Sequence, residues 1–386
     1  MEMTHAGSAS RSASPRRRLL TRSALALVTT LSAAPVAAED ELPPGHPPIP
    51  ASAKADAHQR GGVALPGDIR LHGRFDVAYE RHSYSDAIGD GKDAFRNHHR
   101  LLFVERHTKS DPFYFNAEVL GLNFMEIGAR FKGEGEDIWR ASVTAGKVLV
   151  PFGADPLFHH AYGGRVGADQ RFVPVIWGEY GLKGAIDLDL DPVGLRIDAY
   201  ALRGYALRDA TGILDLQTSG APMDDLNFVG GGRISASWGP ATLYYSVQGG
   251  TLDHDRSMFM HALDLTIWRP DLPVLEDFAL TAGVVRADVW GGGEEAYYNF
   301  ADYLQIRWYP TDCLYVQYRT GLDTRDNRAG LFADAARLDK EDTSAHSVSV
   351  GWLHGNFSLV VQHLWQLELY DEQDDDFLRV IATYEF

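Results

Sequence analysis

The sequence predicts an all-β fold, a single closed antiparallel transmembrane β-barrel of about 16 strands. Three observations predict it. The last segment alternates apolar and polar residues up to the end of the chain, and many earlier segments repeat the same period of two. No run of about 20 apolar residues follows the N-terminal region, which argues against membrane-spanning helices. The mean hydropathy of −0.22 fits this fold, because a barrel intersperses its lipid-facing residues with polar ones.

The C-terminal segment carries the most specific signal. An apolar set of residues alternates with a mostly polar set, as in a strand with one face in lipid. A free apolar edge at a chain terminus promotes aggregation, whereas a closed barrel pairs its last strand with its first. The apolar set is Leu378, Val380, Ala382, Tyr384 and Phe386, and the other set is Arg379, Ile381, Thr383 and Glu385.

This ending resembles the C-terminal signature of Gram-negative outer-membrane β-barrels, with a terminal Phe386 and with Tyr384 two residues before it. The resemblance implies a location in the bacterial outer membrane, in contact with outer-membrane lipid and lipopolysaccharide. It also implies insertion by the barrel-assembly machinery, which would recognise the strand that ends at Phe386.

The N-terminal 38 residues have the pattern of an export signal peptide. A membrane anchor is the alternative, and Arg22 within the apolar stretch weighs against it. Residues 39–67 are rich in Pro, Ala and Gly and predict a disordered periplasmic leader, which leaves 68–386 for the barrel. The signal consists of basic Arg16–Arg18, mostly apolar Leu19–Leu31 and small Val36–Ala38.

Strand-like alternation is clearest over residues 69–79 and recurs along the rest of the chain. The boundaries are uncertain by about two to four residues, and totals of 14 or 18 strands remain open alternatives. Further strands are expected near 97–107, 112–120, 123–131, 137–149, 179–189, 194–204, 227–238, 241–251, 257–268, 277–289, 298–309, 313–321, 344–354, 356–369 and 376–386.

The expected connections alternate between short and long. Outer-membrane barrels have long outer loops and short periplasmic turns. If both termini are periplasmic, the four longest connections all fall on the outer side. They are 81–96, 150–178, 205–226 and 322–343.

Composition and motifs argue against several other functions. The net charge of −17 disfavours nucleic acid as a partner, and the lone Cys313 excludes an intramolecular disulfide. We expect no metal and no cofactor, since neighbours such as His98 and His99 point to opposite faces of a strand. We expect no enzyme either, because His254 with its two flanking aspartates is the only local pattern that suggests catalysis.

The architecture resembles the general porins, which have sixteen strands and a long connection after the fifth strand. That resemblance implies that the 150–178 connection folds inward as a constriction loop, and it implies a homotrimer. Gly146 to Gly153 also resembles the segment with which phosphate-selective O/P-type porins leave a strand.

The strand alternation assigns a set of charged residues to the lumen. Arginines around a narrowed bore focus positive potential and favour anions. The alternative is that these arginines pair with wall acids in an unselective pore. The expected acids are Asp76, Glu80, Asp187, Asp198 and Glu385. The candidate site residues are His159, His160, Arg165, Asp169 and Arg171 in the connection, with Arg70, Arg74, Arg140, Arg196, Arg307, Arg319 and Arg379 on the wall.

The sequence therefore predicts an outer-membrane porin, a passive diffusion channel for small hydrophilic solutes with a preference for anions. The alternative from another class is a non-conducting barrel that acts as a scaffold or adhesin, or as a sleeve for a partner protein.

Overall fold

The structure, a computed structural model, describes residues 62–82, 94–106, 111–122, 124–132, 139–154, 178–207, 216–217, 226–252, 255–268, 275, 277–326, 343–368 and 376–386. Contacts divide the chain into Met1–Ala38 and Glu39–Phe386, and every described residue belongs to the second unit. The expected signal peptide, 1–38, and most of the expected leader, 39–67, lie outside the described residues and stay predictions.

The described part of the chain is all-β, and it contains no helix long and apolar enough to cross a membrane. Two strands are short additions, β1 (Val63–Leu65) and β9 (Leu216–Gln217). The other sixteen form the wall: β2 (Ile69–His82), β3 (Ala94–Arg106), β4 (Phe113–Glu118), β5 (Met125–Lys132), β6 (Trp139–Leu149), β7 (Gly178–Asp189), β8 (Val193–Leu207), β10 (Leu226–Trp238), β11 (Ala241–Leu252), β12 (Arg256–Trp268), β13 (Phe278–Gly291), β14 (Glu294–Thr311), β15 (Leu314–Asp326), β16 (Thr343–His354), β17 (Phe357–Glu368) and β18 (Phe377–Glu385).

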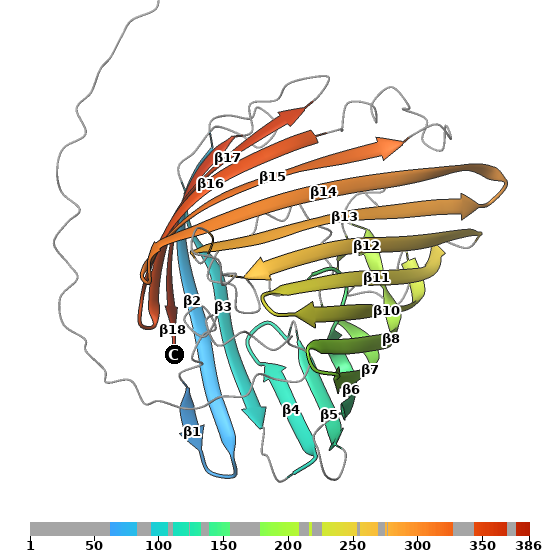
Figure 1. Cartoon of the computed structure of the whole chain (residues 1–386), viewed down its shortest axis with the longest axis horizontal. Helices are drawn as coiled ribbons and strands as arrows, with labels where there is room; N and C mark the ends of the chain where they lie inside the picture. The colour runs from blue at the N-terminus through green and yellow to red at the C-terminus, as the bar shows by residue number, and fades with distance from the viewer. Residues whose placement is uncertain are drawn as a thin grey trace, which may run out of the picture. The chain divides into compact units, whose positions relative to one another are not determined.

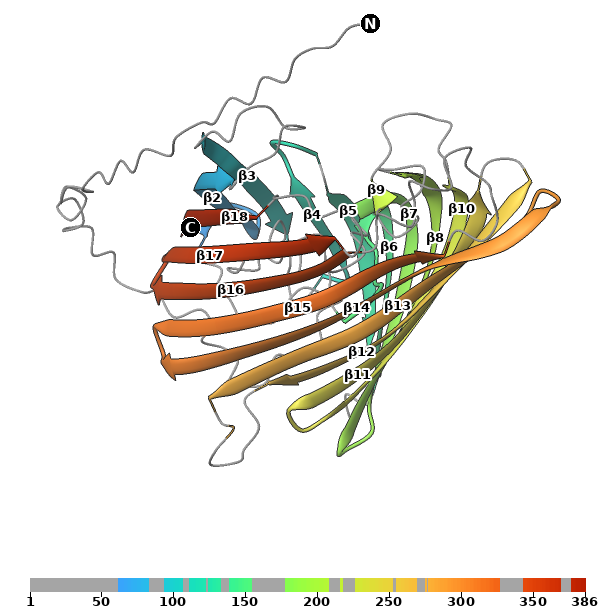
Figure 2. The same ribbon diagram turned by 90° about the horizontal axis from the view of Figure 1, so that it is seen from above.

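The wall closes on itself. Each wall strand pairs antiparallel with the next, β8 pairs with β10 past the short β9, and β18 pairs with β2. Figure 1 shows this last pair, with red β18 beside blue β2, and Figure 2 shows the same wall from above. The predicted fold class, a closed antiparallel barrel of sixteen strands, is confirmed.

The two faces of the wall differ in burial and in chemistry. On β8, Arg196 and Asp198 are buried, whereas Ile197 between them is 39% exposed. On β17, Gln362 is 1% exposed and its neighbour Val361 is 41% exposed. The buried face is the inner one and is largely polar, while the outer face carries the apolar residues, as expected of a barrel whose outside meets lipid.

The closing strands meet around the last residue. The N–H of Phe386 donates to the carbonyl of Gly73 at 3.1 Å, and the N–H of Gly73 donates back at 3.0 Å. The Phe386 ring stacks on Phe75 with centroids 6.1 Å apart. A Cβ atom on Gly73 would lie 2.7 Å from that ring, so the glycine supplies the space that the terminal aromatic occupies.

Strand β1 pairs with the part of β2 that extends beyond the end of β18. The β2–β18 register ends at Arg74 opposite Glu385, and β1 continues alongside β2 with Val63 opposite Leu71. The sheet therefore starts within the range 39–67 that the sequence assigns to the leader. The alternation did not indicate β1, because a strand of 3 residues is too short to show a period of two.

Four inner-face tyrosines each lie directly opposite a glycine on the neighbouring strand. A side chain at any of these glycines would overlap the tyrosine ring, so the glycine lets the ring lie flat across the neighbouring strand. The repeated pairing fixes the register of four strand pairs. The pairs are Tyr114–Gly128, Tyr200–Gly231, Tyr303–Gly283 and Tyr315–Gly351.

Some strands are longer than the sequence predicts. Strand β14 starts at Glu294 instead of near 298, because Gly291, Gly292 and Gly293 all have positive φ and turn the chain within three residues. Strand β15 likewise continues to Asp326, which shortens the expected 322–343 connection.

The turn between β3 and β4 is held by an acid. The Oδ1 atom of Asp111 accepts the N–H of Phe113 at 2.9 Å, and Oδ2 lies 2.7 Å from Nη1 of Arg106. The hydrogen bond from Phe113 and the contact with Arg106 both favour the ionised carboxylate and lower the pKa of Asp111.

Gly351→Ala should destabilise the barrel by about 1–3 kcal/mol, because the new methyl group displaces the Tyr315 ring from its place against the neighbouring strand. Urea unfolding of the folded protein, followed by tryptophan fluorescence, measures the loss. Gly230→Ala is the matched control, since a Cβ there meets nothing within 4 Å. Equal unfolding midpoints for the two variants would contradict the proposed role of the glycine.

Candidate functional site: the inner wall of the barrel

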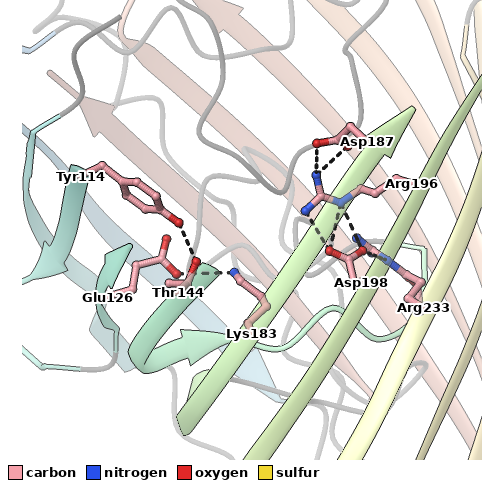
Figure 3. Close-up of polar contacts among 9 residues, drawn as sticks. Tyr114, Glu126, Thr144, Lys183, Asp187, Arg196, Asp198 and Arg233 are labelled. Carbon is pink, nitrogen blue, oxygen red and sulfur yellow. Dashed lines mark hydrogen bonds and ion pairs between the residues drawn. The ribbon is translucent and has the colours of Figure 1, made fainter. Parts of the chain in front are cut away.

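An ion-pair cluster lies on the inner face of β7, β8 and β10. Arg196 Nη1 is 2.8 Å from Asp187 Oδ1, and Arg196 Nη2 is 2.8 Å from Asp198 Oδ1. Arg233 Nη2 approaches the other oxygen of Asp198 at 3.2 Å. Figure 3 shows Asp198 between the two guanidinium groups.

Strand register creates this cluster. Asp187 on β7 lies opposite Arg196 on β8, and Arg233 on β10 lies opposite Asp198. Arg196 and Asp198 are two residues apart, so their side chains project from the same face of β8. The two cations and two anions balance each other, so the cluster carries no formal net charge.

A second set of polar contacts lies on β4 to β7, beside the first. Lys183 Nζ is 3.4 Å from Glu126 Oε2, and the hydroxyls of Tyr114 and Thr144 are 2.6 Å apart (Figure 3). Lys183 and Glu126 are both buried, so each needs the other to offset its desolvation.

The connection after β6 starts along the inner wall. The N–H of Gly153 donates to Ser246 Oγ at 3.0 Å, and its carbonyl accepts from Arg233 Nη1 at 3.2 Å. The backbone of Ala154 lies close to the carboxylate of Asp264. These three partners come from β10, β11 and β12, so the chain leaves β6 and attaches to strands on another part of the ring.

Apolar contacts hold the same segment. Val150 and Phe152 belong to a buried cluster with inner-face residues of β6, β8 and β10 to β14. Among them, Met258 and Met260 are at most 1% exposed. The inner wall is thus apolar on this part of the ring, which strand alternation alone did not predict.

Asp264 connects the anchored segment to the wall behind it. Its Oδ1 atom accepts the hydroxyl of Tyr303 at 2.7 Å. Tyr303 lies opposite Gly283, and a Cβ on that glycine would overlap both Asp264 and the tyrosine ring. The missing side chain at Gly283 therefore keeps the Asp264 carboxylate available to Ala154.

Ion pairs also line the seam between β18 and β2. Arg379 Nε lies 2.7 Å from Glu80 Oε1, and Arg74 Nε lies 2.9 Å from Asp76 Oδ1. Arg74 also reaches Glu385 at 3.8 Å. These wall arginines face acids, as the sequence-based alternative of a charge-paired wall describes.

Arginines on β14 and β15 have a different environment. Arg307 donates to Gln317 Oε1 at 3.0 Å and to the Tyr309 hydroxyl at 2.9 Å, and its guanidinium lies 5.0 Å from the Tyr315 ring centroid. Arg319 stacks on Tyr303 at 5.5 Å and is only 1% exposed. Both of these hydrogen bonds of Arg307 go to neutral groups.

The expected constriction residues His159, His160, Arg165, Asp169 and Arg171 lie outside the described residues. Among the expected wall arginines, Arg74, Arg196 and Arg319 are buried, Arg70, Arg307 and Arg379 are partly exposed, and Arg140 is exposed. Their role in lining a pore stays a prediction.

Sequence reasoning missed Arg233, Lys183, Glu126 and Asp264. All four occupy positions whose side chains alternate toward the inner face of their strands. For Arg233, continuing the alternation through the three glycines before it would have assigned the residue to that face. Their partners could not be found this way, because alternation gives the face of a residue and not its neighbour across the barrel.

Comparison with solved structures identifies the fold. No protein-family model and no curated protein matches the chain. An anion-selective porin from Comamonas acidovorans has a TM-score of 0.55 at 11% identity over 82% of this chain and 99% of that one. OmpF of Salmonella typhi in complex with daunomycin has a TM-score of 0.52 at 11% identity, and the match covers 82% of this chain and 97% of that one. A trimer form of OmpT, an outer membrane protein of Vibrio cholerae, has a TM-score of 0.50 at 9% identity, and the match covers 82% of this chain and 99% of that one. The chain therefore has the fold of outer-membrane porins, which confirms the predicted resemblance at the level of fold.

Ser246→Ala should loosen the start of the connection after β6, because it removes the acceptor of the Gly153 N–H. A lost hydrogen bond of about 0.5–1.5 kcal/mol corresponds to hydrogen exchange at Gly153 that is about two- to tenfold faster. Exchange measured by mass spectrometry on peptides that contain Gly153 tests this. Ser347→Ala is the control, since Ser347 is buried on β16 and its hydroxyl has no hydrogen-bond partner among the described residues. Unchanged exchange at Gly153 in the Ser246 variant would refute the anchor.

Proposed function

We propose that this chain is an outer-membrane porin, a passive diffusion channel for small hydrophilic solutes with a preference for anions. The observation that carries the proposal is the closed ring of sixteen strands with charged and polar side chains inside and apolar side chains outside. Such a ring pairs every strand edge in the membrane and encloses groups that can replace the hydration of a solute. The porins among the similar structures support it.

In this proposal the 150–178 connection narrows the channel. Support comes from Val150–Ala154, which contact inner-wall residues of β10, β11 and β12. The rest of the connection, with its candidate site residues, lies outside the described residues. We propose a channel and not an enzyme, because the carboxylates of Asp187 and Asp198 form ion pairs with Arg196. These ion pairs favour the ionised form of both acids, which makes them poor proton donors.

Location and assembly form part of the same proposal. The fold and the terminal Phe386 support insertion into the bacterial outer membrane by the assembly machinery, with both termini periplasmic, after removal of the export signal 1–38. A homotrimer is supported by the trimer form of the similar OmpT structure.

Two observations support the anion preference. Arg307 has a partly exposed side chain on the inner wall, and its charge adds positive potential to the lumen. An anion-selective porin from Comamonas acidovorans is among the solved structures with the same fold.

Purified, folded protein added to a planar lipid bilayer should produce discrete conductance steps. A water-filled lumen lets ions pass, and the step height reports its narrowest section. Heat-modifiable migration on a denaturing gel confirms that the sample is folded. Folded protein that inserts into the bilayer without conductance steps would refute the channel and favour a scaffold or sleeve.

Arg307→Gln should lower the anion-to-cation permeability ratio by about fivefold, since it removes a lumen charge worth about 1 kcal/mol at close range in water. The reversal potential in a salt gradient measures the ratio. Arg286→Gln is the matched control, because this substitution removes the same charge from the outer face of β13 instead of the inner face. A wild-type channel that selects cations, or equal shifts in both variants, would contradict the anion preference.

A further inference from the structure

The outer face of the barrel carries two cations where lipid is expected. Lys147 lies two residues before the end of β6, and Arg203 lies near the end of β8. Lys147 is flanked on both sides by exposed residues of the outer face, Met125 on β5 and Tyr180 on β7. Both strand ends belong to the rim that carries the connections 150–177 and 208–225.

One aromatic ring joins the two cations. The Lys147 ammonium lies 6.0 Å from the centroid of Tyr180, and the Arg203 guanidinium lies 5.5 Å from it. Cations over a partly exposed ring lose little hydration and still gain electrostatic energy. The three residues therefore form a compact basic patch on three adjacent strands.

Lys147 uses only part of its hydrogen-bonding capacity within the described residues. The Lys147 ammonium donates to the carbonyl of Leu122 at 3.2 Å, which leaves two of its three N–H groups for another acceptor in the described part of the structure. Arg203 Nε lies 3.5 Å from Glu179 Oε1, and the Glu179 side chain is fully buried. Glu179 thus holds the guanidinium in place from the protein side.

Strained, exposed apolar residues flank the patch on both sides. Phe228 at the start of β10 has a φ of 52° and is 84% exposed. It lies opposite Arg203 in the pairing of β10 with β8, and within the register shift between Asn227 and Gly230 in the pairing of β10 with β11. Leu122, the residue that binds Lys147 through its carbonyl, has the same φ of 52° and is 58% exposed. A bulky residue in the left-handed region costs about 1–3 kcal/mol, and such strain marks functional positions.

We propose that the basic patch of Lys147, Tyr180 and Arg203, together with the flanking residues Leu122 and Phe228, binds one lipid A molecule in the outer leaflet of the membrane through a phosphate group. The phosphate accepts hydrogen bonds from Lys147 and Arg203 and is stabilised by their charge. Phe228 and Leu122 lie beside the acyl chains, whose apolar surface they cover. Basic groups at the level of the headgroups and apolar groups next to them match the two halves of an anionic lipid.

Another cation of the outer face, Arg286, differs from Lys147 and Arg203 in its surroundings. Arg286 on β13 also stacks on a tyrosine, Tyr298, at 4.3 Å. However, Asp288 two residues away binds it at 2.6 Å, and both side chains are partly exposed. An acid on the same exposed face competes with a phosphate, whereas Glu118 and Glu179, the acids near Lys147 and Arg203, are fully buried. Arg286 is therefore the matched control position.

The proposal depends on the outer-membrane location given above but not on conduction. Native mass spectrometry of the folded protein in detergent, titrated with diphosphoryl lipid A, counts bound lipid. The variant Lys147→Gln with Arg203→Gln should bind lipid A about tenfold more weakly. Arg286→Gln should bind it as the wild type does, and all three proteins should give the same single-channel conductance.

Further probes separate the sources of the signal. Dephosphorylated lipid A should bind to the wild type weakly, with the affinity that the diphosphoryl form has for the double variant. Inorganic phosphate in about 10-fold excess should not displace bound lipid A when the ionic strength is kept about equal. Equal lipid A affinity in wild type and double variant would overturn the proposal. A double variant that changes the number of subunits instead of the lipid count would identify the patch as a subunit interface.

Phe228→Gly tests the strained position independently of charge. Glycine adopts positive φ without cost, so the variant should unfold at a higher urea concentration than the wild type. It should also bind lipid A more weakly, because the ring that covers the acyl chain is gone. A variant that is stabilised but binds lipid A with unchanged affinity would remove Phe228 from the site.

Discussion

Closure of the strand ring is the constraint on which the rest of the structure depends. In lipid, an unpaired backbone N–H or carbonyl costs several kcal/mol, so no strand edge can face the hydrocarbon. The edges that must meet are β2 and β18, at opposite ends of the described chain, and the pair closes from Arg74–Glu385 to His82–Phe377. A shift by one residue would turn Arg379 and Glu385 toward lipid, so the register has to be fixed. The Phe386 ring over Gly73 fixes it at one end, and the Arg379–Glu80 ion pair fixes it near the other.

The charges inside the ring follow from the same closure. A closed wall buries its inner side chains against one another, and a buried charge needs a partner. Asp198 meets this need twice, through Arg196 and Arg233, and removing one member of such a group typically costs about 3–5 kcal/mol. Much of the charge on the inner wall therefore stabilises the barrel and is already neutralised before any solute arrives.

The sequence predicts closure well because alternation is a local signal that each strand repeats. It places Arg196 and Asp198 on one face of β8, and the strand number follows from counting such segments. It fails where the deciding contact is distant in sequence. Nothing near Gly153 indicates that Ser246 on β11 accepts its N–H, and nothing near Phe152 indicates an apolar inner wall that includes Met258. The start of β14 lies four residues before the predicted position, at the limit of the stated uncertainty, because three glycines with positive φ complete the turn before Glu294.

The ion-pair cluster of the inner wall and the anchor of the connection after β6 share one guanidinium. Arg233 binds Asp198 with Nη2 and the Gly153 carbonyl with Nη1, so it belongs both to the ion-pair cluster and to the anchor of the connection after β6. Neutralising Asp198 would free Arg233 to move, and a displaced Gly153 would leave part of the guanidinium without a partner. Because buried polar networks respond as units, a change in the ion-pair cluster would also alter the anchor. A substitution that removes the charge of Asp198 would therefore require a second substitution at Arg233 to leave the Gly153 contact intact.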